Sequence, residues 1–257
     1  ESGINTNEKG AIIVNNKMQT SNKDIYALGD AVEVKNTITG ERNGIALAGP
    51  ANRQARIVAN NIKGIESSYE GFIGSSILKI FNYSLGIVGL SERACKNLDI
   101  PYKIMIISPY SHATYYPGAK MLTIKAIYNS KTSQILGAYV WGKSSVDKIT
   151  DILSVAIQNK MGAADISALE LCYAPPYSSA KSPVNILGNA IENEMNELVD
   201  TIAVEELKNK ENLYILDVRT IEEYNISHIE GAINIPLDEL RENIEKLDKS
   251  KEPDLSW

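Results

Sequence analysis

The apolar and polar positions of the first 68 residues predict two short strands and one helix. Apolar runs at 10–16 and 25–28 are separated by a polar segment, and the second run ends at Gly29 and Asp30. Between residues 47 and 64 the apolar side chains share one helical face: Ala51, Ala55, Val58, Ala59 and Ile62. Two strands and one helix do not complete a doubly wound sheet, so we expect the C-terminal part of a larger α/β domain.

From about residue 72 the pattern predicts mostly antiparallel strands with helices packed on one face. The apolar positions of 121–129 alternate with Thr123 and Lys125, as in a sheet with one wetter face. The expected strands lie in the segments 75–90 (two strands), 101–108, 121–129 and 134–142. The expected helices are 91–98, 146–159 and 182–195. This arrangement is an α+β domain.

The last 60 residues alternate between strand and helix patterns and predict half of a small α/β domain. The expected elements are a strand at 212–218, a helix from 220, a strand at 231–236 and a helix at 237–247. A polar end, 248–257, follows, and we expect no strand there. The apolar strand at 212–218 should therefore lack one of the two neighbours that a buried strand needs, which would make this segment less stable than the rest.

Charge divides the chain at about the same place. The net charge is −6, but residues 1–197 carry a balance of +2 and residues 198–257 one of −8. We therefore predict three domains, 1–68, 69–197 and 198–257. No basic stripe is interleaved with aromatic residues, which argues against nucleic-acid binding, and no apolar run is long enough for a membrane span. The two cysteines, Cys95 and Cys172, cannot make a disulfide framework, so we expect a cytoplasmic protein with two buried spectator thiols.

Four segments together resemble the C-terminal half of flavin-dependent pyridine nucleotide–disulfide oxidoreductases. They are "GAIIVNNKMQTSNKDIYALGDAVEV", "LAGPANRQARIVANNI", "HATYYPGAKMLTIKAIYN" and "LCYAPPYSSAKSPVNILGNA". Within this superfamily the pair "YYPGA" and "YAPPYSSAK" is most similar to coenzyme A–disulfide reductases and their NADH oxidase relatives. Residues 213–247 resemble the first half of a rhodanese domain, an appendage found on one group of these reductases. The resemblance implies the C-terminal part of an FAD-binding domain, a dimerisation domain and a partial rhodanese-like domain.

The resemblance also implies a flavin site. Gly29 and Asp30 correspond to the residues beside FAD, where the carboxylate accepts a hydrogen bond from a ribityl hydroxyl and the glycine permits close approach. The residue types alone allow an ordinary turn aspartate instead. Thr20 belongs to the same flavin-facing segment, and the helix that starts near Ala51 would direct its free N–H groups toward the flavin ring.

The substrate residues follow from the same resemblance. Tyr115 and Tyr173 correspond to a tyrosine pair delivered into the partner subunit's active site, where a phenol can bind a thiolate or donate a proton. Tyr173 would lie closest to the flavin. Lys181 corresponds to a lysine that binds the substrate's phosphate groups, and Asn52 to a residue that contacts coenzyme A. Each also has a structural alternative: packing for the tyrosines, and an ordinary surface role for Lys181 and Asn52.

Some parts of that chemistry are not found in the sequence. The chain contains no GxGxxG motif, and neither cysteine stands where the family carries its redox cysteine. His112 and His228 have no catalytic partner nearby, and we expect structural roles for both. We therefore expect part of a homodimeric reductase that uses FAD, takes NAD(P)H as co-substrate and acts on a coenzyme A–type small molecule. We expect these 257 residues alone to be inactive. The alternatives are an NADH oxidase that reduces oxygen and a non-catalytic dimerisation module. No metal site is expected.

Overall fold

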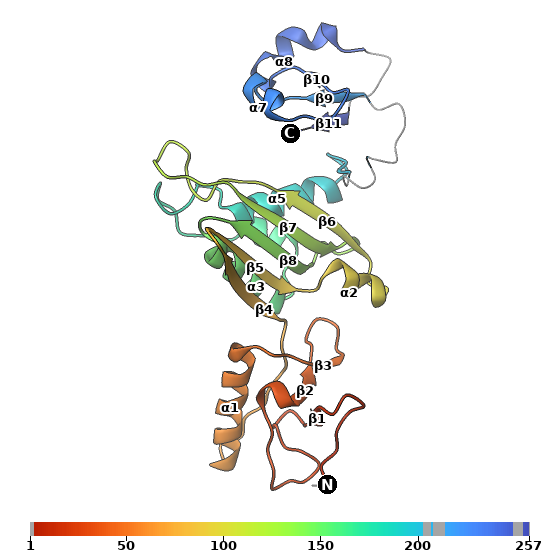
Figure 1. Ribbon diagram of the computed structural model, residues 1–257, viewed down its shortest axis with the longest axis vertical. Coiled ribbons are helices and arrows are strands. Elements are labelled where there is room, and N and C mark those ends of the chain that lie inside the picture. Colours follow the sequence, from red (N-terminus) through yellow and green to blue (C-terminus); the bar gives the residue numbers. More distant parts are fainter. Residues whose placement is uncertain (1–2, 203–206, 208–213, 249–253, 257) are drawn as a thin grey trace. The chain divides into compact units, whose positions relative to one another are not determined.

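The computed structural model describes residues 3–202, 207, 214–248 and 254–256 (Figure 1). The chain divides into two compact units, Glu1–Asp200 and Thr201–Trp257. Each unit is described by itself below. Predicted residues 212 and 213 of the last apolar strand lie outside the described residues.

The first unit begins with a small sheet and one long helix. The elements are β1 (Ile12–Ile13), η1 (Gly29–Ala31, a 3₁₀ turn), β2 (Val32–Lys35), β3 (Arg42–Gly44) and α1 (Ala48–Ile62). The strand order is β1-β2-β3, with β1 parallel and β3 antiparallel to β2. A cluster of buried side chains fills this part: Val14, Met18, Val32, Val34, Tyr69 and Phe72. The predicted helix is confirmed with almost the expected ends, but its predicted apolar face is not: Ala55, Ala59 and Ile62 are exposed, and the buried residues are Pro50 and Gln54.

The strand predicted at 25–28 is wrong. Only Tyr26 pairs, in an isolated antiparallel bridge with Gln19, and the central strand of the small sheet is β2. The cause is local hydrogen bonding, since the Ala27 N–H donates to the Met18 carbonyl and the Thr20 N–H to the Ile25 carbonyl. Because the backbone groups of this segment are satisfied within a loop, they do not need a sheet partner.

A five-stranded sheet forms the centre of the rest of the first unit. Its strands are β4 (Ser75–Ile80), β5 (Tyr83–Gly89), β6 (Tyr102–Ile107), β7 (Leu122–Asn129) and β8 (Ile135–Gly142). Their order is β4-β5-β8-β7-β6, and every neighbouring pair is antiparallel. The prediction of an antiparallel α+β domain is confirmed.

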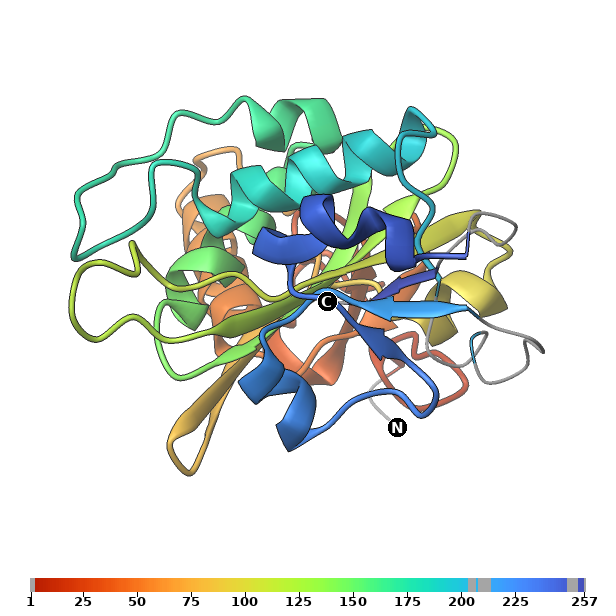
Figure 2. The same cartoon turned by 90° about the horizontal axis from the view of Figure 1, so that it is seen from above.

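Helices bury one face of this sheet, as the view from above shows (Figure 2). They are α3 (Val146–Gln158), α4 (Ala163–Ser167) and α5 (Pro183–Met195). Helix α2 (Glu92–Asn97) lies on the opposite face, where its buried Cys95 packs with Ile127 and Leu136, so the expectation that the helices lie on one face is wrong for α2. Helix α3 packs on β5 and β8, and α5 packs on α4 and β6. Fully buried aliphatic residues from both layers meet in the core: Leu122, Ile124, Ile149, Leu153, Leu187 and Ile191. The core therefore fixes the ends of the loops that leave the sheet.

The second unit contains a three-stranded parallel sheet. Its elements are β9 (Ile215–Asp217), α7 (Ile221–Ile226), β10 (Ile233–Asn234), α8 (Leu237–Asn243), η2 (Ile244–Lys246) and β11 (Asp254–Ser256). The order is β10-β9-β11. The expectation that β9 lacks a neighbour is wrong, because β11 forms in the polar end where no strand was expected. Pairing uses backbone N–H and C=O groups, so a polar segment supplies it as well as an apolar one.

A buried ion pair holds the turn after β9. The carboxylate of Asp217 has no exposed surface and accepts two hydrogen bonds from the Arg219 guanidinium, at 3.0 Å from Nε and 2.6 Å from Nη2. Asn234 on β10 donates to the backbone carbonyls of both residues. The hydrogen bonds from Arg219 hold the pKa of Asp217 below its usual value. His228 stacks on Tyr224, and its Nδ1 lies 2.9 Å from the Tyr224 carbonyl oxygen, in keeping with the expected structural role.

Replacing Gly86 by alanine should destabilise the first unit. A Cβ at Gly86 would collide with the Thr150 side chain of α3, whose hydroxyl donates to the Val146 carbonyl at 2.7 Å. We expect Gly86→Ala to cost about 1–3 kcal/mol of unfolding free energy in urea titrations. Gly49→Ala is the matched control, because a Cβ there meets no atom within 4 Å. Equal stability of Gly86→Ala and wild type would contradict the close approach of α3 to β5.

Asp217 should make the second unit sensitive to acid. Because the folded-state pKa of Asp217 is lowered, the stability it contributes is present above its unfolded pKa of about 4 and is lost as the pH falls further. Asp217→Asn should destabilise this unit at pH 7 by about 3 kcal/mol, since it leaves Arg219 without its anion. Hydrogen exchange of residues 214–236, followed by mass spectrometry, measures this effect. The difference in exchange rate between Asp217→Asn and wild type should become smaller below pH 4. The control Glu222→Gln, at an exposed position, should exchange like wild type at both pH values.

Candidate functional site

The η1 turn presents Asp30 at the start of β2. Gly29 adopts the left-handed region, with φ +73°, where a side chain would be strained, and its Cα faces Ala51 of α1. The carboxylate of Asp30 is exposed and forms no hydrogen bond or ion pair among the described residues. The structure therefore brings Gly29, Asp30 and Ala51 together and leaves a strong acceptor available to a hydroxyl-bearing ligand.

The N-terminus of α1 lies next to this turn and has no side-chain cap. Leu47 occupies the N-cap position, and the first turn contains no acidic residue. The Asn52 side chain is exposed and donates from Nδ2 to the Ala48 carbonyl at 2.9 Å, which leaves its Oδ1 free. An uncapped helix start favours a ligand with negative charge. Together with the free carboxylate of Asp30, this terminus fits a flavin with its sugar-alcohol chain and its anionic reduced ring.

Gln54 of α1 connects the turn to the helix, and the sequence analysis missed it. Its side chain is completely buried, and its Oε1 accepts a hydrogen bond of 2.7 Å from the Gly29 N–H. Its Nε2 has no hydrogen-bond partner among the described residues. Its position in the sequence could have indicated that Gln54 faces inward. It lies three residues after Ala51 and four before Val58, and these positions share one side of a helix.

Thr20 lies in the loop before the turn and is buried. Its hydroxyl donates to the Asn22 carbonyl at 3.0 Å and accepts from the Asn22 N–H at 3.2 Å. The Thr20 side chain therefore holds its own loop and is engaged within it.

Tyr115 and Tyr173 meet in a second place on the first unit. Their hydroxyl oxygens lie 2.7 Å apart although the residues are 58 positions apart in the sequence. Tyr115 is 74% exposed and Tyr173 46%. The hydrogen bond with Tyr173 raises the pKa of Tyr115 above its usual value. They border an open pocket of about 470 Å³, which is lined by Pro109, Tyr110, Ala113, Thr114, Tyr115, Tyr173, Ser179, Ala180 and Ile186.

The two loops that bear these tyrosines are held at their bases. The Ala113 N–H donates to the Ser178 carbonyl at 3.1 Å, which joins one loop directly to the other. Buried His112 places Nδ1 3.1 Å from the Ala113 carbonyl oxygen and meets Tyr116 edge to face, so it shapes the first loop. The second loop connects α4 to α5 and is closed by a single buried amide, that of Asn185.

Asn185 makes four hydrogen bonds at this base. The two N–H groups of its Nδ2 are shared among the carbonyls of Ile166, Ser167 and Leu169, and its Oδ1 accepts from the Ser182 N–H. The residues on the two sides of the loop are thereby fixed to the first turn of α5. Tyr173 lies on a loop whose two ends cannot move apart without breaking these bonds.

Lys181 and the cysteines take no part in the tyrosine pair. Lys181 follows the lining residue Ala180, is exposed, and pairs with none of the described residues. Cys95 is fully buried, as expected, and burial raises the pKa of its thiol. The expectation that Cys172 is also buried is wrong, because it is exposed next to Tyr173. A thiol with a raised pKa is a poor nucleophile, which agrees with a spectator role for Cys95. The described residues contain no cluster of three potential metal ligands.

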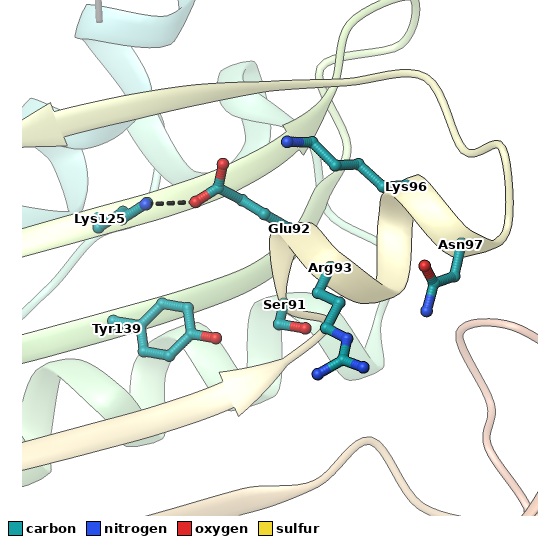
Figure 3. Close-up of a pocket in the computed structure, with 7 residues that line it drawn as sticks. All are labelled: Ser91, Glu92, Arg93, Lys96, Asn97, Lys125 and Tyr139. Atoms are coloured by element: carbon teal, nitrogen blue, oxygen red, sulfur yellow. Dashed lines mark hydrogen bonds and ion pairs between the residues drawn. The ribbon is translucent and has the colours of Figure 1, made fainter. Parts of the chain in front are cut away.

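A larger hollow of about 630 Å³ lies beside α2 (Figure 3). Glu92 forms an ion pair with Lys125 there, while Arg93 and Lys96 point away from each other. None of the residues predicted to bind a ligand lines it. Its charged groups do not converge on one point, so we assign it no ligand. None of the helices in the described part of the chain is long and apolar enough to cross a membrane.

Comparison with protein families gives three matches. Residues 1–55 match the model "Pyridine nucleotide-disulphide oxidoreductase", residues 75–183 match its dimerisation domain, and residues 201–254 match the rhodanese-like domain. These matches confirm the predicted family and the predicted classes of fold.

Individual proteins agree with the family matches. The coenzyme A disulfide reductase of Staphylococcus aureus (strain bovine RF122 / ET3-1) is 37% identical over 73% of this chain and 42% of its own length. The reduced CoADR-RHD of Bacillus anthracis superposes with a TM-score of 0.91 at 41% identity, and an NAD-dependent persulfide reductase from A. fulgidus with 0.92 at 35%. Both solved structures cover 99% of this chain, which spans 46% of each of them. The chain therefore spans less than half the length of these proteins.

The tyrosine pair generates a prediction that needs no ligand. Tyr173→Phe should lower the pKa of Tyr115 toward its usual value of about 10, because the phenol loses the partner that stabilises its protonated form. Since the folded-state pKa is raised, the contribution to stability is present below the unfolded pKa and is lost as the pH rises through the folded-state value. NMR titration of ¹³C-labelled tyrosine measures this shift. Tyr177→Phe, on the same loop, should leave Tyr115 unchanged, and an unshifted Tyr115 in Tyr173→Phe would disprove the bond.

Proposed function

Because residues 1–55 and 75–183 belong to the pyridine nucleotide-disulphide oxidoreductases and residues 201–254 to the rhodanese-like domains, we propose that this chain is part of a flavoprotein disulfide reductase. Its reaction takes electrons from NAD(P)H through FAD to coenzyme A disulfide or a related persulfide or polysulfide. The hydrogen-bonded pair of Tyr115 and Tyr173 beside an open pocket is the observation that carries the proposal. We place the protein in the cytoplasm, in keeping with its two spectator thiols.

The flavin end of the site uses the η1 turn and the start of α1. When bound, FAD supplies the two-electron chemistry that side chains lack. Asp30 accepts hydrogen bonds from hydroxyls of the cofactor, Gly29 and Ala51 allow close approach, and the helix terminus stabilises negative charge. Thr20 supports the η1 side of the flavin site from its buried loop.

The substrate end uses the two tyrosine-bearing loops. Phenols are protonated at neutral pH, so the hydrogen-bonded pair holds a proton for a thiolate that leaves a disulfide. Lys181, unpaired among the described residues, is available for a phosphate group, and the free Oδ1 of Asn52 for a donor of the coenzyme A moiety. The exposure of both tyrosines supports their delivery to the active site of a second copy in a homodimer.

An NADH oxidase that reduces oxygen is the alternative activity, and a non-catalytic dimerisation module the alternative of another class. The tyrosine pair favours the disulfide reductase, because the reduction of oxygen needs no group that binds a thiolate. The rhodanese-like segment points the same way, since it adds sulfur chemistry to the same protein. The 257 residues by themselves are expected to show no NAD(P)H-dependent turnover.

Mutation of the pair tests the proposal in the flavin-loaded reductase that contains this chain. Tyr115→Phe and Tyr173→Phe should each lower kcat with coenzyme A disulfide by about 10–100-fold, and the double variant by little more, because the two phenols act as one unit. Thiol release and oxygen uptake, measured in the same samples, separate the two enzyme activities. Tyr177→Phe is the control. Full disulfide reductase activity in the double variant, or turnover with oxygen alone, would refute the assignment.

A further inference from the structure

Gln54 is a polar side chain that α1 buries more completely than its apolar neighbours Ala51 and Val58, which are half-buried. It has no exposed surface, and its neighbours at helical spacing, Ala51 and Val58, face the same way. Its Nε2 carries two N–H donors that find no acceptor among the described residues. An unpaired buried donor costs free energy, and a methionine or leucine of similar size would avoid that cost. The one hydrogen bond that Gln54 does make therefore has to explain why a glutamine stands here.

That bond connects Gln54 to the backbone of the η1 turn. The Gly29 N–H donates to Oε1 at 2.7 Å. The turn has only three residues, and within it the Val32 N–H donates to the Gly29 carbonyl. Because Gly29 stands in the left-handed region, the short turn has no strong conformational preference of its own. The Gln54 amide therefore sets where the turn lies against α1.

The position of the η1 turn against α1 affects the residues of both elements that face the proposed flavin. Asp30 follows Gly29 directly, and Ala51 and Asn52 lie within one turn of Gln54 on the same helix. We propose that Gln54 is a positioning residue of the flavin site, which fixes the carboxylate of Asp30 relative to the start of α1 through the Gly29 amide. This inference deepens the proposed function and depends on it for the identity of the ligand. The coupling between Gln54 and the turn stands on the geometry alone.

The first experiment measures that coupling without flavin. In the 257-residue chain, the Gly29 amide should be protected from hydrogen exchange in ¹⁵N NMR spectra. Gln54→Met should increase its exchange rate at least tenfold, while Gln54→Glu retains an acceptor and should keep most of the protection. Arg56→Met, an exposed change on the same helix, controls for effects on helix stability. Unchanged protection of Gly29 in Gln54→Met would overturn the proposal.

The second experiment measures the effect on the cofactor in the flavin-loaded reductase. Gln54→Met should weaken FAD binding about tenfold when Asp30 is present and by less than twofold in an Asp30→Ala background, because it acts through that carboxylate. Gln54→Glu should restore most of the affinity. The dissociation constant is read from the quenching of flavin fluorescence, and the visible spectrum reports the flavin environment.

The outcomes separate the two claims. If Gln54→Met weakens FAD binding equally with Asp30 and with Asp30→Ala, Gln54 acts only on folding, and the positioning role is overturned. If Gly29 loses protection in Gln54→Met but neither Gln54→Met nor Asp30→Ala changes FAD binding, the coupling is upheld and the flavin site of the proposed function is refuted.

Discussion

The close packing of two layers, the antiparallel sheet and the helices α3 and α5, is the constraint on which the candidate substrate site depends. Tyr115 lies on the loop between β6 and β7, and Tyr173 on the loop between α4 and α5. Neither loop has regular structure that would place its tyrosine. The ends of both are fixed because the strands and helices that they join share one buried core. Two hydroxyls from distant parts of the sequence can therefore meet at hydrogen-bond distance.

Buried amide side chains hold both the loop that bears Tyr173 and the turn that bears Asp30. Asn185 joins the two sides of the Tyr173 loop with four hydrogen bonds, and Gln54 holds the turn that carries Asp30 with one. An amide suits this task because it carries a donor and an acceptor but no charge to desolvate. Asn185 is fully used, whereas Gln54 leaves its donor unpaired. This difference marks the η1 turn as the place where the free energy of an unpaired buried donor is accepted.

Much of this fold could be predicted from the sequence, and the failures have physical causes. The antiparallel sheet follows from side-chain periodicity, which reports the burial of one face. The extent of α1 was also predicted, but its buried face was not, because Gln54 is buried while Ala55, Ala59 and Ile62 are exposed. The strand expected at 25–28 failed because its backbone bonds close within a loop, and β11 was missed because backbone pairing does not depend on apolar side chains. The tyrosine pair came from family resemblance, since no periodicity relates two loops. Gln54 was missed because the sequence does not show which group a single polar residue on an apolar face hydrogen-bonds.

The bond between Tyr115 and Tyr173 has a consequence for how protons are held at the pocket. Each phenol has one O–H, and a bond between them uses only one of the two. Whichever ring donates to the other, one hydrogen stays directed away from the pair. Rotation about two C–O bonds therefore moves the available hydrogen from one ring to the other without any change in net charge. The pair therefore offers one hydrogen to a neighbouring acceptor, and that hydrogen can come from either ring.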